Sequence, residues 1–237
     1  MKNLLIFFKI ILIFFGANLF SQEKLKVTYE GTMSLDETNA TSKFGGRFVP
    51  ATFELIIDGK LSEFKEVEKL ITSQEGERPP ATIASEDYYI DLNQNLYFYK
   101  WNFNNKEFII SDTLQILDWK LQKETKELLG ISLRKATFEL DDDKITAWYA
   151  PKLPYKIGPE LYCGLPGLIL EIEIRGISSE NAIWTDRFVA QNLEILNDQY
   201  KIKFPKGKII SEEESDKIFD ESSKKMTEMY GGGVDKD

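Results

Sequence analysis

Apolar and polar residues alternate in short runs along most of this chain, and this period of two predicts β-strands rather than helices. In the clearest run, residues 168–175, the apolar side chains are expected to face a core, whereas Glu171, Glu173 and Arg175 face water. The other runs expected to form strands are 25–33, 52–57, 60–67, 88–90, 95–101, 107–111, 117–122, 131–140, 144–150, 183–190 and 193–204. The run 60–67 also fits one face of a helix, but its place after an Asp-Gly dipeptide favours a strand.

Polar turns join these runs, so each strand is expected to pair with its neighbour in sequence. The Asp-Gly dipeptide at 58–59 is the strongest hairpin signal. Further turns are expected at 124–127 and at 141–143, and a last hairpin is expected around 197–198. Residues 151–163 contain three prolines and are expected to form a long, stiff connection rather than a central strand.

A single helix is expected near the C-terminus, over about 211–230. Ser211 is the candidate N-cap, and Glu214, three residues later, completes a capping box. The glycine run 231–233 is expected to end the helix. Its apolar face would come from Ile218, Met226 and Met229.

The fold class that follows is mainly β: a large curved antiparallel sheet or open (half-)barrel with a C-terminal helix. Strands do not alternate with long helices, which argues against a parallel α/β fold. The order of elements is similar, at the level of fold, to the half-barrels of bacterial lipoprotein carriers. Residues 22–237 are expected to form one β-rich domain.

The first 21 residues have the layout of a secretory signal peptide, with a basic start, an apolar stretch over 4–15 and a plausible cleavage region over 16–21 before Gln22. An uncleaved anchor is the alternative, but the apolar stretch is shorter than the ~20 residues that a membrane span needs. We therefore expect an exported mature protein that does not span the membrane and works in the periplasm or at the outer membrane.

Composition excludes several kinds of chemistry. The chain contains no histidine and one cysteine, and its formal net charge is −9. Without histidine, neither a Ser-His-Asp nor a Cys-His site can form, and a His/Cys zinc site is excluded, so we expect no cofactor and no metal. An acidic protein gains nothing from nucleic-acid phosphates, so we expect no nucleic-acid partner. The lone Cys163 is expected to be a small buried residue, the alternative being a nucleophile that no histidine could activate.

A turn motif stands directly before the clearest strand. It consists of Gly164, Leu165, Pro166, Gly167, Leu168 and Ile169. Pro166 presets its own φ and Gly167 tolerates a positive φ, so residues 165–168 are expected to form a type II turn. The motif either starts a core strand or, because loops on a rigid scaffold often carry function, contacts a ligand or partner.

Three further stretches carry a recognisable pattern. They are Trp119-Lys120-Leu121 with Glu124-Thr125-Lys126, Gly130 and Lys135-Ala136; Ala147-Trp148-Tyr149 with Pro154 and Gly158-Pro159; and Lys206-Gly207-Lys208 with Ile210-Ser211 and Glu212-Glu213. Together with the turn motif they cover most of the chain, which resembles the GLPGLI family of exported Bacteroidetes proteins. The resemblance implies export and carries no established activity. The family often has a cysteine where this chain has Leu133.

Aromatic residues gather in two stretches, 88–103 and 148–162. Adjacent aromatics in a strand place rings on both faces of a sheet, so some rings must meet water, a ligand or a covering segment. Four of them are the candidates for binding an apolar ligand or a protein partner: Trp148, Tyr149, Tyr155 and Tyr162.

The sequence therefore favours an exported, non-enzymatic binding module of the cell envelope, which holds an apolar ligand or an envelope protein. The alternative is a carboxylate-based hydrolase acting on cell-envelope material, because aspartates and glutamates are abundant and two of them suffice for glycoside hydrolysis. No catalytic residue is assigned, because the sequence marks no two carboxylates as a pair.

Overall fold

The computed structural model of the protein describes residues 23–38, 48–67, 82–83, 85–140, 142–197 and 199–231. These residues form β1 (Leu25–Asp36), β2 (Ala51–Asp58), β3 (Leu61–Glu66), β4 (Tyr88–Asp91), β5 (Leu96–Phe103), β6 (Lys106–Thr113), β7 (Lys120–Leu128), β8 (Ile131–Leu140), β9 (Asp143–Ala150), β10 (Leu168–Ile177), β11 (Ile183–Ile195), β12 (Lys208–Ile210) and α1 (Glu212–Gly231). The expected signal peptide, residues 1–21, lies outside the described residues.

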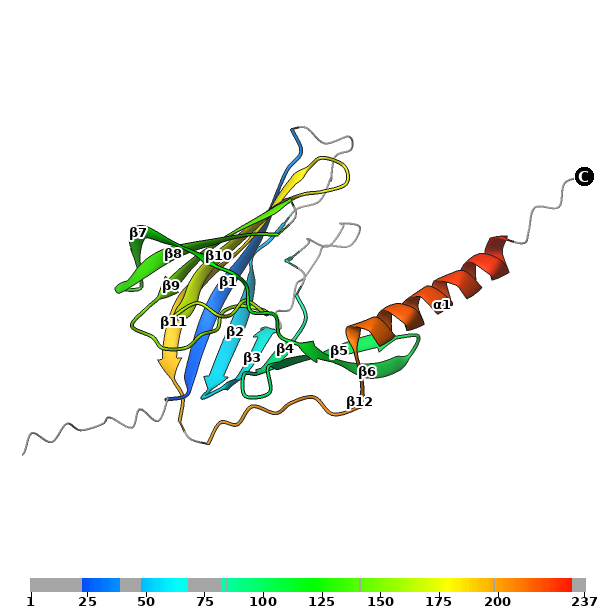
Figure 1. Ribbon diagram of the computed structural model, residues 1–237, viewed down its shortest axis with the longest axis horizontal. Coiled ribbons are helices and arrows are strands. Elements are labelled where there is room, and N and C mark those ends of the chain that lie inside the picture. Colours follow the sequence, from blue (N-terminus) through cyan, green and yellow to red (C-terminus); the bar gives the residue numbers. More distant parts are fainter. Residues whose placement is uncertain are drawn as a thin grey trace, which may run out of the picture.

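All twelve strands belong to one curved sheet, in the order β12-β6-β5-β4-β3-β2-β1-β11-β10-β9-β8-β7 (Figure 1). Neighbouring strands pair antiparallel, except that β12 runs parallel to β6. The sheet does not close on itself, because its two edge strands, β12 and β7, do not pair. The expected fold class, a large curved sheet with a C-terminal helix, is confirmed.

One expected turn and one expected hairpin are absent from the described residues. Residues 124–127 belong to β7, which turns only at Leu129-Gly130. This strand is rich in Lys and Glu, which are rare in strands, but at an edge of the sheet their side chains reach water. The hairpin expected around 197–198 is also absent: β11 is one continuous strand that ends at Ile195, and the next strand is β12. Asp198 itself lies outside the described residues.

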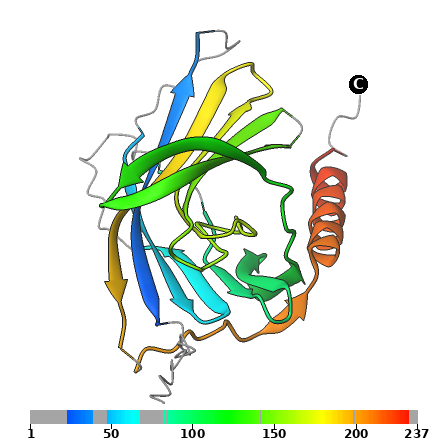
Figure 2. The ribbon, with the colours of Figure 1, turned by 60° about the vertical axis from the view of Figure 1, so that its left-hand side comes forward.

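The main core lies inside the curve of the sheet. Rings of Phe53, Phe64 and Phe188 meet there with centroids 5.1 to 5.6 Å apart. The connection between β9 and β10, residues 151–167, also lies inside the curve (Figure 2) and adds buried side chains such as Leu165 to this core. Burial of one such large side chain contributes about 1.5–3 kcal/mol. The connection thus takes the place of a second layer.

Helix α1 begins with the expected capping box. The Ser211 amide donates to Glu214 Oε2 at 3.0 Å, and the Glu214 amide donates to Ser211 Oγ at 3.2 Å. Ile218 packs on a small cluster with Phe108, Ile110 and Ile210, whereas Met226 of the expected apolar face is 54% exposed. The Met229 side chain lies outside what the structure describes. No helix among the described residues is long and apolar enough to cross a membrane.

Candidate functional site

The turn motif does not form the expected type II turn. The positive φ, 93°, belongs to Gly164, whereas Gly167 has no positive φ. The Leu168 amide donates to Leu153 O at 3.0 Å and the Ile169 amide to Ile157 O at 3.0 Å. The motif therefore docks on the preceding connection instead of closing a turn of its own.

Gly167 is required for another reason, the close approach of two backbone segments. A Cβ on Gly167 would lie 2.2 Å from the carbonyl oxygen of Ala150, far inside contact distance. The Tyr29 hydroxyl donates at 2.6 Å to the carbonyl of Ile169, next to a β-bulge in the pairing of β9 with β10. Leu165, Leu168 and Ile169 are buried. These contacts favour the core-strand interpretation of the motif.

A segment of the chain, residues 114–119, links β6 to β7 and so crosses the open side of the sheet (Figure 2). We call it the crossing segment. It is tied to the motif, because the indole Nε1 of Trp119 donates to Cys163 O at 2.8 Å. The Cys163 thiol is buried, lies 3.8 Å from Gln115 O, and has its pKa raised to about 11 by burial. Cys163 is therefore the small buried residue that the sequence predicts.

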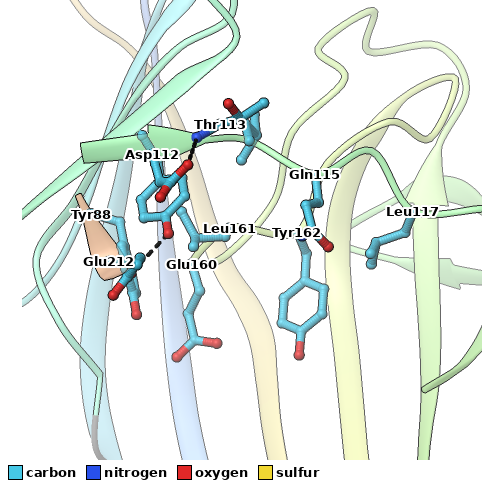
Figure 3. A pocket seen from close by; sticks show the side chains of 11 residues that line it. Tyr88, Asp112, Thr113, Gln115, Leu117, Glu160, Leu161, Tyr162 and Glu212 are labelled. Atoms are coloured by element: carbon cyan, nitrogen blue, oxygen red, sulfur yellow. Dashed lines mark hydrogen bonds between the residues drawn. The ribbon is translucent and has the colours of Figure 1, made fainter. Parts of the chain in front are cut away.

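A pocket of about 500 Å³ lies where the crossing segment, the β9–β10 connection and the start of α1 meet (Figure 3). We call it the Glu160 pocket. It is lined by Tyr88, Tyr97, Asp112, Thr113, Leu114, Gln115, Leu117, Glu160, Leu161, Tyr162 and Glu212. Strands β4, β5 and β6 supply its wall on one side, and the connection supplies Glu160 to Tyr162 on the other. The pocket thus combines apolar and aromatic surface with three carboxylates.

Tyrosine hydroxyls hold the Glu212 carboxylate at the first residue of α1. Tyr97 donates to Glu212 Oε1 at 2.8 Å, and Tyr99 donates to Glu212 Oε2 at 3.1 Å. The two tyrosines are two residues apart on β5 and therefore face the same side of the sheet. Burial, together with the charge of Glu212, raises the pKa of both phenols, so they stay protonated as donors.

Glu160 is the most perturbed acid of the pocket. It occupies a positive φ of 52°, rare for a residue with a side chain, in a turn that the Tyr162 amide closes on Pro159 O at 3.2 Å. Its side chain points into the pocket between Tyr162 on one side and Tyr88 and Glu212 on the other (Figure 3). Burial raises the pKa of Glu160 to about 7, a hydrogen bond with Ser85 opposes this, and the charge of Asp186 adds to it.

Asp186 on β11 is a second carboxylate inside the curve of the sheet. Its Oδ1 is buried and finds no hydrogen-bond partner in the described part of the chain. Burial raises the pKa of Asp186 to about 6. Burial also raises the pKa of Tyr162, as do the charges of Glu160, Asp143 and Asp186. The interior beside the pocket is therefore acidic.

The four aromatic candidates do not come together. Only Tyr162 lines the Glu160 pocket. Tyr149 is buried in the core, and the Tyr155 hydroxyl donates to Glu23 O at 2.8 Å beside a different, much smaller hollow. Trp148 packs under Lys126, whose Nζ lies 4.4 Å from the ring centroid. In the other aromatic stretch, residues 88–103, the rings of Tyr89 and Phe98 are covered by the ring of Phe204.

Sequence reasoning missed the acids of the pocket. Glu212 was noted only within the expected helix and in the last stretch of the family resemblance, and Glu160 is one glutamate in a proline-bearing connection. The available signal for a buried acid was the position of Glu160. It lies between Pro159 and Leu161, in a segment that links two core strands. Among the described residues, no group of three or more His, Cys, Asp or Glu could hold a metal ion.

Glu171, expected on a solvated face, is instead 7% exposed. Lys126 donates to one carboxylate oxygen and Arg187 donates to the other at 2.8 Å. Burial alone would raise the pKa of Glu171, but the hydrogen bonds from Lys126 and Arg187 lower it below its ordinary value. The expectation is wrong because β7 and β11 bring two cations over this face of β10.

We therefore expect Glu171→Ala to lower the free energy of unfolding by about 1–3 kcal/mol at pH 7. The control is Glu173→Ala, two residues further on β10, which should change it by no more than about 0.5 kcal/mol. Because the folded protein lowers the pKa of Glu171, its contribution is present above pH 4.5 and is lost as the pH falls through the folded pKa. Urea unfolding at several pH values measures this; equal effects of the two variants at pH 7 would contradict it.

The fold and the pocket define a class of protein: an open, curved β-sheet that wraps an inserted connection and carries an acidic, tyrosine-lined pocket beside it. The chain belongs to the family described as N-glycanase peptide, N-terminal domain (PNGase F-II N), whose model matches residues 62–203, more than half of the chain. No protein with a curated description matches the sequence.

Among solved structures, that of PNGF-II in its P21 crystal form is similar, with a TM-score of 0.53 and 15% identity over 83% of this chain and 33% of PNGF-II. Its C2 form gives a TM-score of 0.47 and 19% identity over 80% and 31%. The LolA superfamily protein NE2245 from Nitrosomonas europaea gives 0.31 and 9% identity over 77% and 91%, a score too low to establish a common fold. This chain therefore shares a fold with a part of PNGF-II and spans about a third of its length.

Proposed function

We propose that this chain is an exported, non-enzymatic binding module of the cell envelope, and that its ligand site is the Glu160 pocket. The observation that carries the proposal is the pocket itself: about 500 Å³ with converging carboxylates and phenols. Small-molecule sites have volumes of roughly 300–1,000 Å³ and a few convergent polar groups. Export rests on the signal-peptide pattern of residues 1–21 and on the resemblance to the GLPGLI family, which stays a prediction.

Family membership supports a module rather than a complete enzyme. The matching model describes the N-terminal domain of an N-glycanase, and the chain corresponds to 33% of PNGF-II. Fold likeness alone does not transfer an activity, so the function must be argued from the pocket. An apolar ligand and an envelope protein partner both remain predictions.

The test is a chemical-shift titration of the ¹⁵N-labelled protein against small cationic, neutral and anionic compounds. We expect at least one class to shift amides of Thr113, Leu161 and Tyr162, which line the pocket. Tyr162→Ala should weaken this binding, whereas Tyr155→Ala, outside the pocket, should not. The proposal fails if none of these compounds perturbs the lining residues.

A carboxylate-based hydrolase is the second candidate, because Glu160 and Glu212 line the same pocket and burial raises the pKa of Glu160 to about 7. A carboxylic acid that stays protonated near neutral pH is suited to general-acid catalysis. Turnover of aryl glycosides would be compared in the parent, Glu160→Gln and Glu212→Gln. A loss of at least 100-fold in kcat in both variants would favour the hydrolase over the binding module.

A further inference from the structure

We propose that the ligand of the Glu160 pocket is a small organic cation, a protonated amine on an apolar stem, whose ammonium group is held by Glu160. This inference rests on the proposed function and adds the chemical class of the ligand. The charge of the lining, the buried Asp186 oxygen beside it and the aromatic walls support this assignment.

The lining carries negative groups and, in the described part of the chain, no lysine or arginine. Asp112, Glu160 and Glu212 contribute carboxylates from three separate elements. Glu212 already accepts hydrogen bonds from two phenols, whereas the hydrogen-bond partner of Glu160 among the described residues is the neutral Ser85. An anionic ligand would be repelled, and a cation would supply the countercharge that Glu160 lacks.

A second observation points the same way. Asp186 Oδ1 is buried without a hydrogen-bond partner among the described residues, and the charge of Asp186 acts on both Glu160 and Tyr162. A buried polar atom left without a partner costs free energy and calls for an explanation such as an absent ligand, ion or water. The carboxylates of Glu160 and Asp186 therefore both lie near Tyr162, and Glu160 and Tyr162 line the pocket.

The remaining walls suit an ammonium group on an apolar stem. Tyr88, Tyr97 and Tyr162 supply aromatic rings, to whose faces cations are attracted. Leu114, Leu117 and Leu161 supply apolar surface for the stem. A neutral polyol could also donate to the carboxylates, but it would leave the charge of Glu160 uncompensated, and so the geometry favours the cation.

The experiment compares three probes of the same length at about pH 8 and low salt: n-butylammonium chloride, n-butanol and sodium butyrate. Amide shifts of the ¹⁵N-labelled protein report both affinity and position. We expect n-butylammonium to shift Thr113, Leu161 and Tyr162 with a Kd on the order of 1–10 mM, as befits a fragment of five heavy atoms. Butanol should bind at least about tenfold more weakly, and butyrate should leave these residues unchanged.

The decisive variant is Glu160→Gln, which keeps the shape and removes the charge. We expect it to weaken n-butylammonium at least about tenfold while leaving the affinity for n-butanol unchanged. Glu139→Gln removes the same charge from an exposed end of β8 and should change neither affinity. Unchanged amide spectra away from the pocket would show that both variants fold.

The failures of the two proposals are distinguishable. If n-butanol or butyrate binds the lining residues as tightly as n-butylammonium, or if Glu160→Gln leaves all affinities unchanged, the cation assignment is wrong and the binding module stands. If n-butylammonium shifts only residues outside the pocket, the assignment is also wrong. If no probe of any charge perturbs the lining residues, both the cation assignment and the proposed function fail.

Discussion

Gly167→Ala should lower the free energy of unfolding by about 3 kcal/mol or more, or prevent folding altogether. A Cβ at this position would lie 2.2 Å from the carbonyl oxygen and 2.7 Å from the carbonyl carbon of Ala150, and 3.0 Å from the Cα of Pro151. These are backbone atoms at the end of β9, and they cannot rotate away as a flexible side chain would. The motif is held against them by the hydrogen bond from the Leu168 amide to Leu153 O.

The matched control is Gly59→Ala in the turn between β2 and β3. Gly59 has a φ of 64° and open space around a Cβ, so the same substitution there costs only the left-handed backbone strain, about 1 kcal/mol. Urea unfolding with an unchanged m-value measures both. If Gly167→Ala folds as well as Gly59→Ala but no longer binds a ligand, the motif is a recognition loop and the core-strand interpretation is wrong.

The second large effect is pH-dependent. Glu160→Gln should be more stable than the parent by about 3 kcal/mol above pH 7 and similar to it below about pH 4. Burial raises the folded-state pKa of Glu160 from its ordinary 4.5 to about 7. The folded protein therefore holds this proton more tightly than the unfolded chain, so ionisation destabilises the fold progressively between these two values, and the full cost is present above pH 7.

This prediction is checked by denaturant unfolding of both proteins from pH 4 to pH 8. Asp186, Tyr88 and Tyr162, which interact electrostatically with Glu160, are unchanged in the variant, so most of their own titration cancels. Glu212, which lines the same pocket, is also unchanged. Glu139→Gln serves as the control for loss of one negative charge. Stability curves of the parent and Glu160→Gln that run parallel over this range would contradict the burial of an uncompensated carboxylate.

A loss of folding stability on ionisation of Glu160 is consistent with a role of this residue in binding rather than in stabilising the fold. The residue has a positive φ of 52°, where a side chain adds strain, and its carboxylate is buried beside Asp186. Either feature would be relieved by a glycine at this position. A bound cation would offset the electrostatic part of this cost.

Local pattern explains what the sequence predicted well. Period-two runs and polar turns located most strands, because adjacent antiparallel pairing needs only neighbouring segments. The capping box of Ser211 and Glu214 is equally local and was placed correctly. The failures are non-local. The strand expected over 117–122 continues as β7 through the expected turn 124–127, because these residues pair with β8. Glu171 is buried because Lys126 and Arg187 reach it from other strands.

The pocket was harder to predict because its lining is distributed along the chain. Tyr88, Asp112, Glu160 and Glu212 lie far apart in sequence and meet only when the β9–β10 connection folds inside the sheet. The positive φ expected at Gly167 is wrong for a similar reason. A glycine is required at position 167 because the backbone of Ala150 approaches it closely. This is a tertiary contact, which the sequence preferences of turns do not predict.

The measurement that tests the account most directly is a ¹³C titration of the Glu160 side-chain carboxyl, in the free protein and in the presence of saturating n-butylammonium. In the free protein we expect its pKa near 7, because the carboxyl is buried without a countercharge. With the cation bound, the pKa of Glu160 should fall towards or below its ordinary value, because a nearby positive charge favours the carboxylate. An identical Glu160 titration with and without n-butylammonium would contradict the account.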